Sequence, residues 1–124
     1  MRKFVYPQEI IVWNIIPYLR KEIALEMIKK GIEQKKIATY LTITEAAVSQ
    51  YVNDKRAYKK FNLTRSIKME ISNSADKIIS KKSDILIEIQ RLLSLPELKA
   101  EICLIHKKDY GASINCQACL MGAT

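Results

Sequence analysis

The stretch QKKIATYLTITEAAVSQYVNDKR, residues 34–56, decides the fold that the sequence predicts. Apolar residues recur in it at the three- and four-residue spacing of an amphipathic helix, first over 34–41 and again from 45 to about 53. Thr44 is placed to cap the second helix at its N-terminus. The short link between the two periodic runs predicts two small helices joined by a tight turn.

Four positions of this stretch predict how the two helices pack. Counting Gln34 as one, a small residue falls at five, and apolar or aromatic residues fall at ten, fifteen and eighteen: Ala38, Ile43, Val48 and Tyr51. Such offsets allow two short helices to cross steeply through a tight turn. The pattern resembles the helix-turn-helix of phage-repressor-like (XRE) regulators, including short archaeal regulators with a cysteine-bearing tail. Thr42 departs from the family, which usually has glycine in the turn. If the backbone at this position is left-handed, threonine lowers the stability of the fold by about 1 kcal/mol relative to glycine.

The rest of the chain predicts an all-α protein. Proline and glycine, three of each, are too scarce for a β protein with many turns, and apolar residues recur at helical spacing nearly throughout. A helix is expected from Pro17 to Lys30, ended by Gly31. The short apolar segment before it is expected to pack Trp13 and Ile16 inward.

Further helices are expected after residue 63. Thr64 and Ser83 are candidate caps for two of them, and Ser94 with Glu97 forms the S-x-x-E capping box of a last helix that extends toward His106. A composition shift at residues 55–62 predicts a boundary between a helix-turn-helix domain, 1–60, and a helical region, 61–124. The two middle helices are expected to carry the apolar residues Ile67, Ile71, Ala75, Ile78, Leu86, Ile89 and Leu93.

The charge of the chain favours a phosphate-bearing partner. The net charge is +8, of which residues 1–60 hold +6. A positive field of this kind attracts nucleic acid, and it would also attract an anionic membrane surface. The longest early apolar run, IIVWNII, is interrupted by Asn14 and is far shorter than the roughly 20 residues that span a bilayer. With an odd number of cysteines, three, the sequence predicts a cytoplasmic protein.

The outer face of the second short helix is the predicted DNA-reading surface. With Val48, Tyr51 and Val52 turned inward, the remaining side chains are small or are short and polar, as the major groove requires. The lysines and arginine that follow are expected to contact phosphate, although a solvated polar face is the plainer interpretation of either feature alone. The predicted double-stranded DNA contacts are Gln34, Thr44, Glu45, Ala46, Ser49, Gln50, Asn53, Lys55, Arg56, Lys59 and Lys60.

A second group of residues predicts a metal centre near the C-terminus. Cys103 and His106 form a C-x2-H motif, and Cys116 and Cys119 form a C-x2-C motif. Nine residues separate the two motifs. Both spacings are typical of zinc knuckles, but three thiolates with a replaceable fourth ligand would also hold an iron-sulfur cluster. The sequence does not separate these two cofactors, and the plainer interpretation is a core cysteine followed by free thiols.

Together these features predict a non-enzymatic, sequence-specific transcriptional regulator. Its cysteine centre either senses redox or metal state or is a zinc site that only stabilises the C-terminal segment. The helices over 64–95 are the expected homodimer surface, unless they only cover the core of their own chain. One alternative is a thiol-redox protein that uses Cys116 and Cys119, although no strand is evident to support such a motif. The other is an antitoxin-like DNA-binding interaction module.

Overall fold

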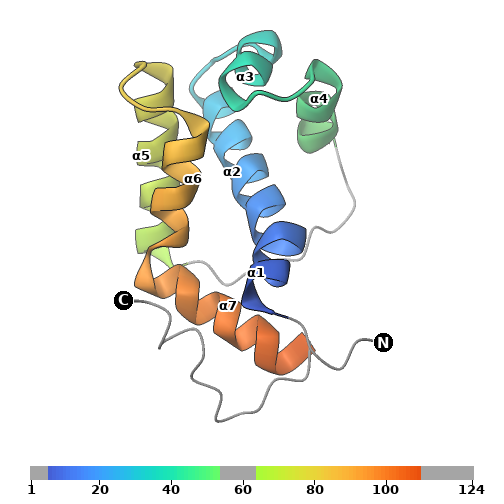
Figure 1. Cartoon of the computed structure of the whole chain (residues 1–124). Coiled ribbons are helices and arrows are strands. Elements are labelled where there is room, and N and C mark those ends of the chain that lie inside the picture. Colours follow the sequence, from blue (N-terminus) through green and yellow to red (C-terminus); the bar gives the residue numbers. More distant parts are fainter. Residues whose placement is uncertain (1–5, 54–63, 110–124) are drawn as a thin grey trace.

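The computed structural model describes residues 6–53 and 64–109, and its regular structure within those ranges is entirely helical. The all-α prediction is therefore confirmed. No described helix has the length and apolar character needed to cross a membrane. In chain order the elements, shown in Figure 1, are α1 (Pro7–Ile10), η1 (Ile11–Ile15), α2 (Ile16–Lys29), α3 (Gln34–Leu41), α4 (Glu45–Asn53), α5 (Arg65–Ile79), α6 (Ile85–Leu93) and α7 (Pro96–Asp109).

The first three elements run on as one helix, which begins ten residues earlier than predicted. The π-helical segment η1 lies just before Pro17, whose missing N–H and bulky ring would disrupt a regular α-helix at that point. The five-residue spacing of a π-turn brings Ile10 and Ile15 to the buried side. Trp13 is 49% exposed, so the prediction that it packs inward was wrong, whereas Ile16 packs partly buried against the core.

The long helix α2 is the centre of the molecule and contacts α3, α4, α5 and α6. In Figure 1, α5 and α6 form an antiparallel pair along one side of it, α3 and α4 lie at its C-terminal end, and α7 crosses beneath its N-terminal end. Gly31 ends α2 as predicted, because its φ of +83° lets the Ile32 amide reach back to the Met27 carbonyl at 3.1 Å.

One hydrophobic core joins the segments on either side of residues 54–63. Helix α7 packs against α1 and α6, and α5 packs along α2. The expected domain boundary lies outside the described residues, and the division into two domains stays a prediction. Buried side chains from both segments belong to the same cluster, among them Leu19, Ile23, Ile37, Val48, Ile71, Leu92 and Ile102.

The capping of α5 agrees with the prediction, but that of α6 and α7 does not. The Thr64 hydroxyl accepts the Ile67 amide at 3.2 Å. Asp84, not Ser83, caps α6, and its carboxylate accepts the Ile87 amide at 2.9 Å. Leu86, one of the apolar residues expected on this helix, is 68% exposed in its first turn.

Helix α7 begins at Pro96 without the predicted capping box. The Ser94 hydroxyl turns back and donates to the Arg91 carbonyl at 2.6 Å, so Ser94 closes α6. The carbonyl of Leu95 instead accepts the first amides of α7. Proline suits the first helical position because the N–H it lacks would have no partner there.

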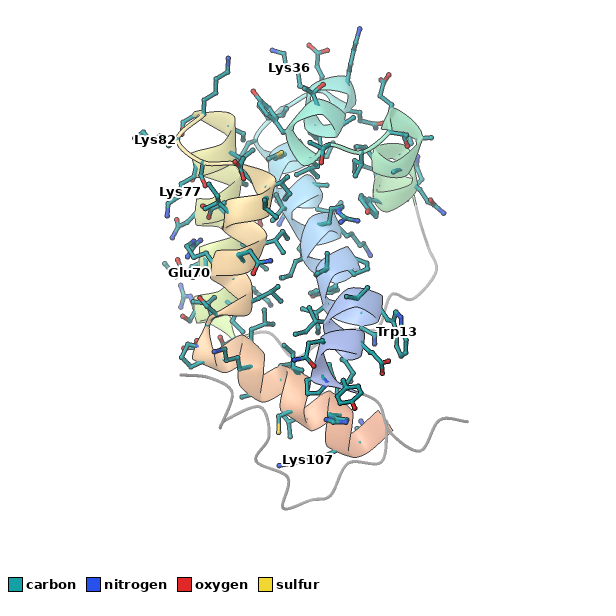
Figure 2. All side chains as sticks on the ribbon, viewed as in Figure 1. Trp13, Lys36, Glu70, Lys77, Lys82 and Lys107 are labelled. Carbon is teal, nitrogen blue, oxygen red and sulfur yellow. The ribbon has the colours of Figure 1, made fainter. Side chains whose placement is uncertain are left out.

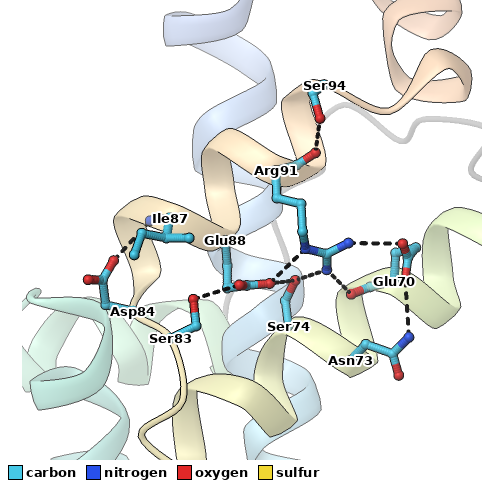
Figure 3. Close-up of polar contacts among 9 residues, drawn as sticks. All are labelled: Glu70, Asn73, Ser74, Ser83, Asp84, Ile87, Glu88, Arg91 and Ser94. Atoms are coloured by element: carbon cyan, nitrogen blue, oxygen red, sulfur yellow. Dashed lines mark hydrogen bonds and ion pairs between the residues drawn. The ribbon is translucent and has the colours of Figure 1, made fainter.

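A buried polar cluster fastens α6 to α5 (Figure 3). Glu88, 2% exposed, accepts hydrogen bonds from Ser74 at 2.8 Å and Ser83 at 2.6 Å. Arg91 pairs with Glu88 at 3.0 Å and with Glu70 at 2.9 Å. Burial acts to raise the pKa of Glu88, but the bonds from Ser83, Ser74 and Arg91 outweigh it and hold the pKa below its usual value. Glu88 is therefore a buried charge whose acceptors are well occupied.

Candidate nucleic-acid interface

Helix α3 presents one face to the core and ends in a left-handed turn. Ile37, Ala38 and Leu41 are buried, as predicted from their spacing. Thr42 has φ +55° and ψ +41°, and the Ile43 amide bonds to the Ala38 carbonyl at 3.0 Å. The turn therefore has the backbone that glycine would favour, and threonine occupies it at a cost of about 1 kcal/mol.

Helix α4 starts where the sequence predicted. The Thr44 hydroxyl accepts the Ala47 amide at 3.1 Å, which confirms Thr44 as the cap. Val48 is completely buried and Tyr51 packs partly buried against the core. Val52 is 37% exposed, so the expectation that it turns inward was wrong. Val48 is the one fully buried residue of α4, and Tyr51 is the contact that its last turn makes with the core.

The outer side of α4 carries the predicted residues, which are small or are short and polar. Glu45, Ala46, Gln50 and Asn53 are exposed. Ser49 is half-buried, and its hydroxyl donates a 2.8 Å hydrogen bond to the side-chain oxygen of Gln34 on α3. The structure thus brings together two predicted DNA-contact residues that are fifteen positions apart in sequence. The hydroxyl proton of Ser49 is donated to Gln34 within the protein.

The basic residues around this surface are only partly described. Lys55, Arg56, Lys59 and Lys60 lie outside the described residues. Sequence reasoning missed Lys35 and Lys36, which are exposed on the first turn of α3 directly after Gln34. The KK pair next to a predicted contact residue was the available signal. Figure 2 shows Lys36 at the end of the molecule that carries α3.

The predicted metal ligands are divided between described and undescribed parts of the chain. Cys103 is buried on α7, and His106 is half-buried one turn later on the same helix. Residues three apart on a helix are neighbours, so these two donors suit one half of a knuckle-type site. Cys116 and Cys119 lie outside the described residues. Within residues 6–53 and 64–109 no three potential ligands cluster.

Comparison with known proteins gives no relative for this chain: no protein-family model, curated protein or solved structure matches the sequence. The likeness to phage-repressor-like regulators therefore stays a prediction.

Proposed function

We propose that this chain is a sequence-specific DNA-binding transcriptional regulator whose α3, turn and α4 act as a helix-turn-helix. The observation that supports this most is the contrast between the two sides of the α3–α4 pair. The inner side is buried against the core, and the outer side of α4 exposes small or short polar side chains. Ala38 and Val48 hold the two helices on the core, while Ala46, Gln50 and Asn53 remain exposed. A major groove about 12 Å wide admits a helix of this character.

Each outer residue has a role in the proposed complex. Gln50 can pair bidentately with adenine, Glu45 can accept from the amino group of cytosine, and Ala46 can touch a thymine methyl group. Ser49 serves by positioning Gln34, since its proton is already donated at 2.8 Å. Gln34 keeps its amide nitrogen as a donor, and the lysines and arginine of residues 55–60 supply phosphate contacts that set affinity.

The proposed regulator acts as a cytoplasmic homodimer. One short helix contacts too few base pairs for a genomic site, and two-fold repetition doubles them. Most apolar side chains of α5 and α6 are already buried against their own chain, so few of them are left to form the proposed homodimer surface. Met69, Leu86 and Ile87 are the large apolar side chains between 64 and 95 that stay exposed. A melting temperature that rises with protein concentration would support the dimer, and one that stays constant would contradict it.

The cysteine centre is proposed as a structural or sensing metal site. Cys103 and His106 would supply one half, and Cys116 and Cys119 the other. Bound zinc would stabilise the C-terminal segment, whereas an iron-sulfur cluster could be lost or oxidised and so report redox state. Helix α7 fixes the positions of Cys103 and His106, because it packs against α1 and α6.

Selection from a pool of random duplexes tests the proposed function. The purified protein should enrich a common sequence, and its dissociation constant for that sequence should be at least about 10³-fold lower than for random duplex at the same salt concentration. Retention of all duplexes with equal affinity would contradict sequence-specific recognition and leave only nonspecific binding.

A further inference from the structure

We propose that the turn between α5 and α6 is a second phosphate-contact surface, through which Lys81 and Lys82 bind the DNA backbone. This inference rests on the proposed function and extends it, because every DNA contact predicted above lies within residues 34–60. The C-terminal helices would then take a direct part in DNA binding, in addition to any role in dimerisation.

A hollow beside α3 brings this turn next to the proposed DNA-reading unit. It has a volume of about 520 Å³ and is lined by Tyr40 and Thr42 on one side and by Lys81, Ser83 and Asp84 on the other. The α5–α6 turn therefore lies beside the turn that joins α3 to α4. Lys30 strengthens this arrangement, because its ammonium group at the end of α2 pairs with Asp76 on α5 at 2.8 Å.

The α5–α6 turn is held rigidly. Lys81 has φ +64°, and the Lys82 amide bonds to the Lys77 carbonyl at 2.9 Å, which closes the end of α5. The next residue, Ser83, donates to the buried Glu88 at 2.6 Å. Lysines on a fixed backbone bind a polyanion at a smaller entropy cost than lysines on a mobile loop.

The turn also carries positive charge that the described residues leave unpaired. Lys81 and Lys82 are exposed, and no ion pair is found for either within the described part of the chain. Lys29 and Lys30, by contrast, pair with Glu26 and Asp76. Figure 2 places Lys82 and Lys77 at the same end of the molecule as Lys36. This end thus gathers cations from α3 and from the α5–α6 turn.

The groups around the hollow favour ionic contact with phosphate. Asp84 is an opposing charge, but its carboxylate accepts the Ile87 amide at the N-terminus of α6, where the helix dipole offsets it. The hydroxyls of Thr42 and Ser83 already donate inside the protein, to the Leu41 carbonyl and to Glu88. The contact we infer is therefore made by ammonium groups, and it strengthens binding to all duplex sequences alike.

The test measures the salt dependence of binding to a duplex of random sequence. In the double variant Lys81→Ala/Lys82→Ala, the slope of log K against log salt should fall in magnitude by about 2, since each phosphate contact contributes about 0.9. The matched control is Lys107→Ala/Lys108→Ala, which removes the same charge at the opposite end of the molecule (Figure 2). Far-UV circular dichroism verifies that both variants fold.

An equal slope in the two double variants would overturn the inference. The proposed function would survive that result if the wild type still enriches a preferred sequence, so the two failures are distinguishable. Absence of any duplex binding by the wild type would overturn both. Loss of binding to anionic lipid vesicles in Lys81→Ala/Lys82→Ala, with duplex binding unchanged, would assign the turn to a membrane surface and contradict the inference.

Discussion

The Ser49 hydroxyl donates to the side-chain oxygen of Gln34 across 2.8 Å, and this bond joins the first turn of α3 to the middle of α4. The side chain of Gln34 is therefore oriented by the helix beside it. In the proposed complex, Ser49 acts on DNA through Gln34 and not by contact of its own. This geometry makes the two residues one unit, and their substitutions should not be additive.

A double-mutant cycle tests that coupling. Ser49→Ala and Gln34→Ala should each weaken binding to the preferred duplex by about 1 kcal/mol. The loss in the double variant should be smaller than the sum of the two single losses, by at least about 0.5 kcal/mol. Fluorescence anisotropy titration measures all four proteins. The control cycle pairs Ser49→Ala with Gln90→Ala, an exposed glutamine on α6. Additive losses for Ser49 and Gln34 would mean that the bond does not operate in the complex.

Thr42 offers a test of the left-handed turn. Thr42→Gly should raise the free energy of unfolding by about 1 kcal/mol, because glycine adopts φ near +55° without the steric cost of a β-carbon. Thr39→Gly is the matched control, and it should lower stability by about 0.5 kcal/mol because Thr39 lies within α3, where glycine is a poorer helix former than threonine. Urea denaturation measures both. A destabilised Thr42→Gly protein would indicate that the turn has another conformation.

Glu88 should make stability depend on acid pH. Its pKa in the folded protein lies below the ordinary value of 4.5, so its stabilising contribution is present above about pH 4.5 and is lost as pH falls through the lower folded value. Glu88→Gln should cost about 3 kcal/mol at pH 7. It should also flatten the pH dependence of the melting temperature below about pH 4.5.

Glu97→Gln is the control for this prediction, because Glu97 is an exposed carboxylate. Its effect at pH 7 should stay below about 1 kcal/mol, and it should keep most of the acid-range slope. If the Glu88 and Glu97 variants show the same pH profile, the cluster around Glu88 does not carry the acid sensitivity.

The helical periodicity predicted most of the fold, since each helix buries one stripe that the sequence displays. The buried Ile37, Ala38, Leu41 and Val48 and the Thr44 cap were all predicted from local pattern. Local pattern failed where two residues competed for one role. Ser83 and Asp84 are both good caps, and Asp84 caps α6 because Ser83 bonds to Glu88, which packs against α5.

Contacts between distant segments account for two features that the sequence did not predict, and a local change of helix type accounts for the error at Trp13. The Ser49–Gln34 bond depends on how α3 crosses α4, which no short-range pattern encodes. Glu88 lies on an apolar stripe with Arg91 three residues later, which is a signal for a buried ion pair. The further partners come from another helix: Ser74 bonds to Glu88, and Glu70 pairs with Arg91. Trp13 was misplaced because the π-turn before Pro17 rotates the preceding residues.

The cysteine centre is tested by the composition of the purified protein. We expect stoichiometric zinc, or iron with sulfide, after anaerobic purification, and loss of that metal in Cys116→Ser. Cys116 is preferred to Cys103 for this test, because Cys103 is buried on α7 and its replacement would disturb packing as well. Elemental analysis and a visible spectrum identify the metal. A metal-free wild type whose stability and DNA affinity are unaffected by Cys116→Ser would refute the proposed site.

The most direct test of the central claim compares Gln50→Ala on α4 with Gln90→Ala on α6, two exposed glutamines on different helices. If α4 lies in the major groove, Gln50→Ala should weaken binding to the preferred duplex by about 1 to 3 kcal/mol while random-duplex affinity hardly changes. Gln90→Ala should leave both affinities as in the wild type. Equal losses on the preferred and the random duplex in Gln50→Ala, or no loss on either, would contradict base recognition by α4.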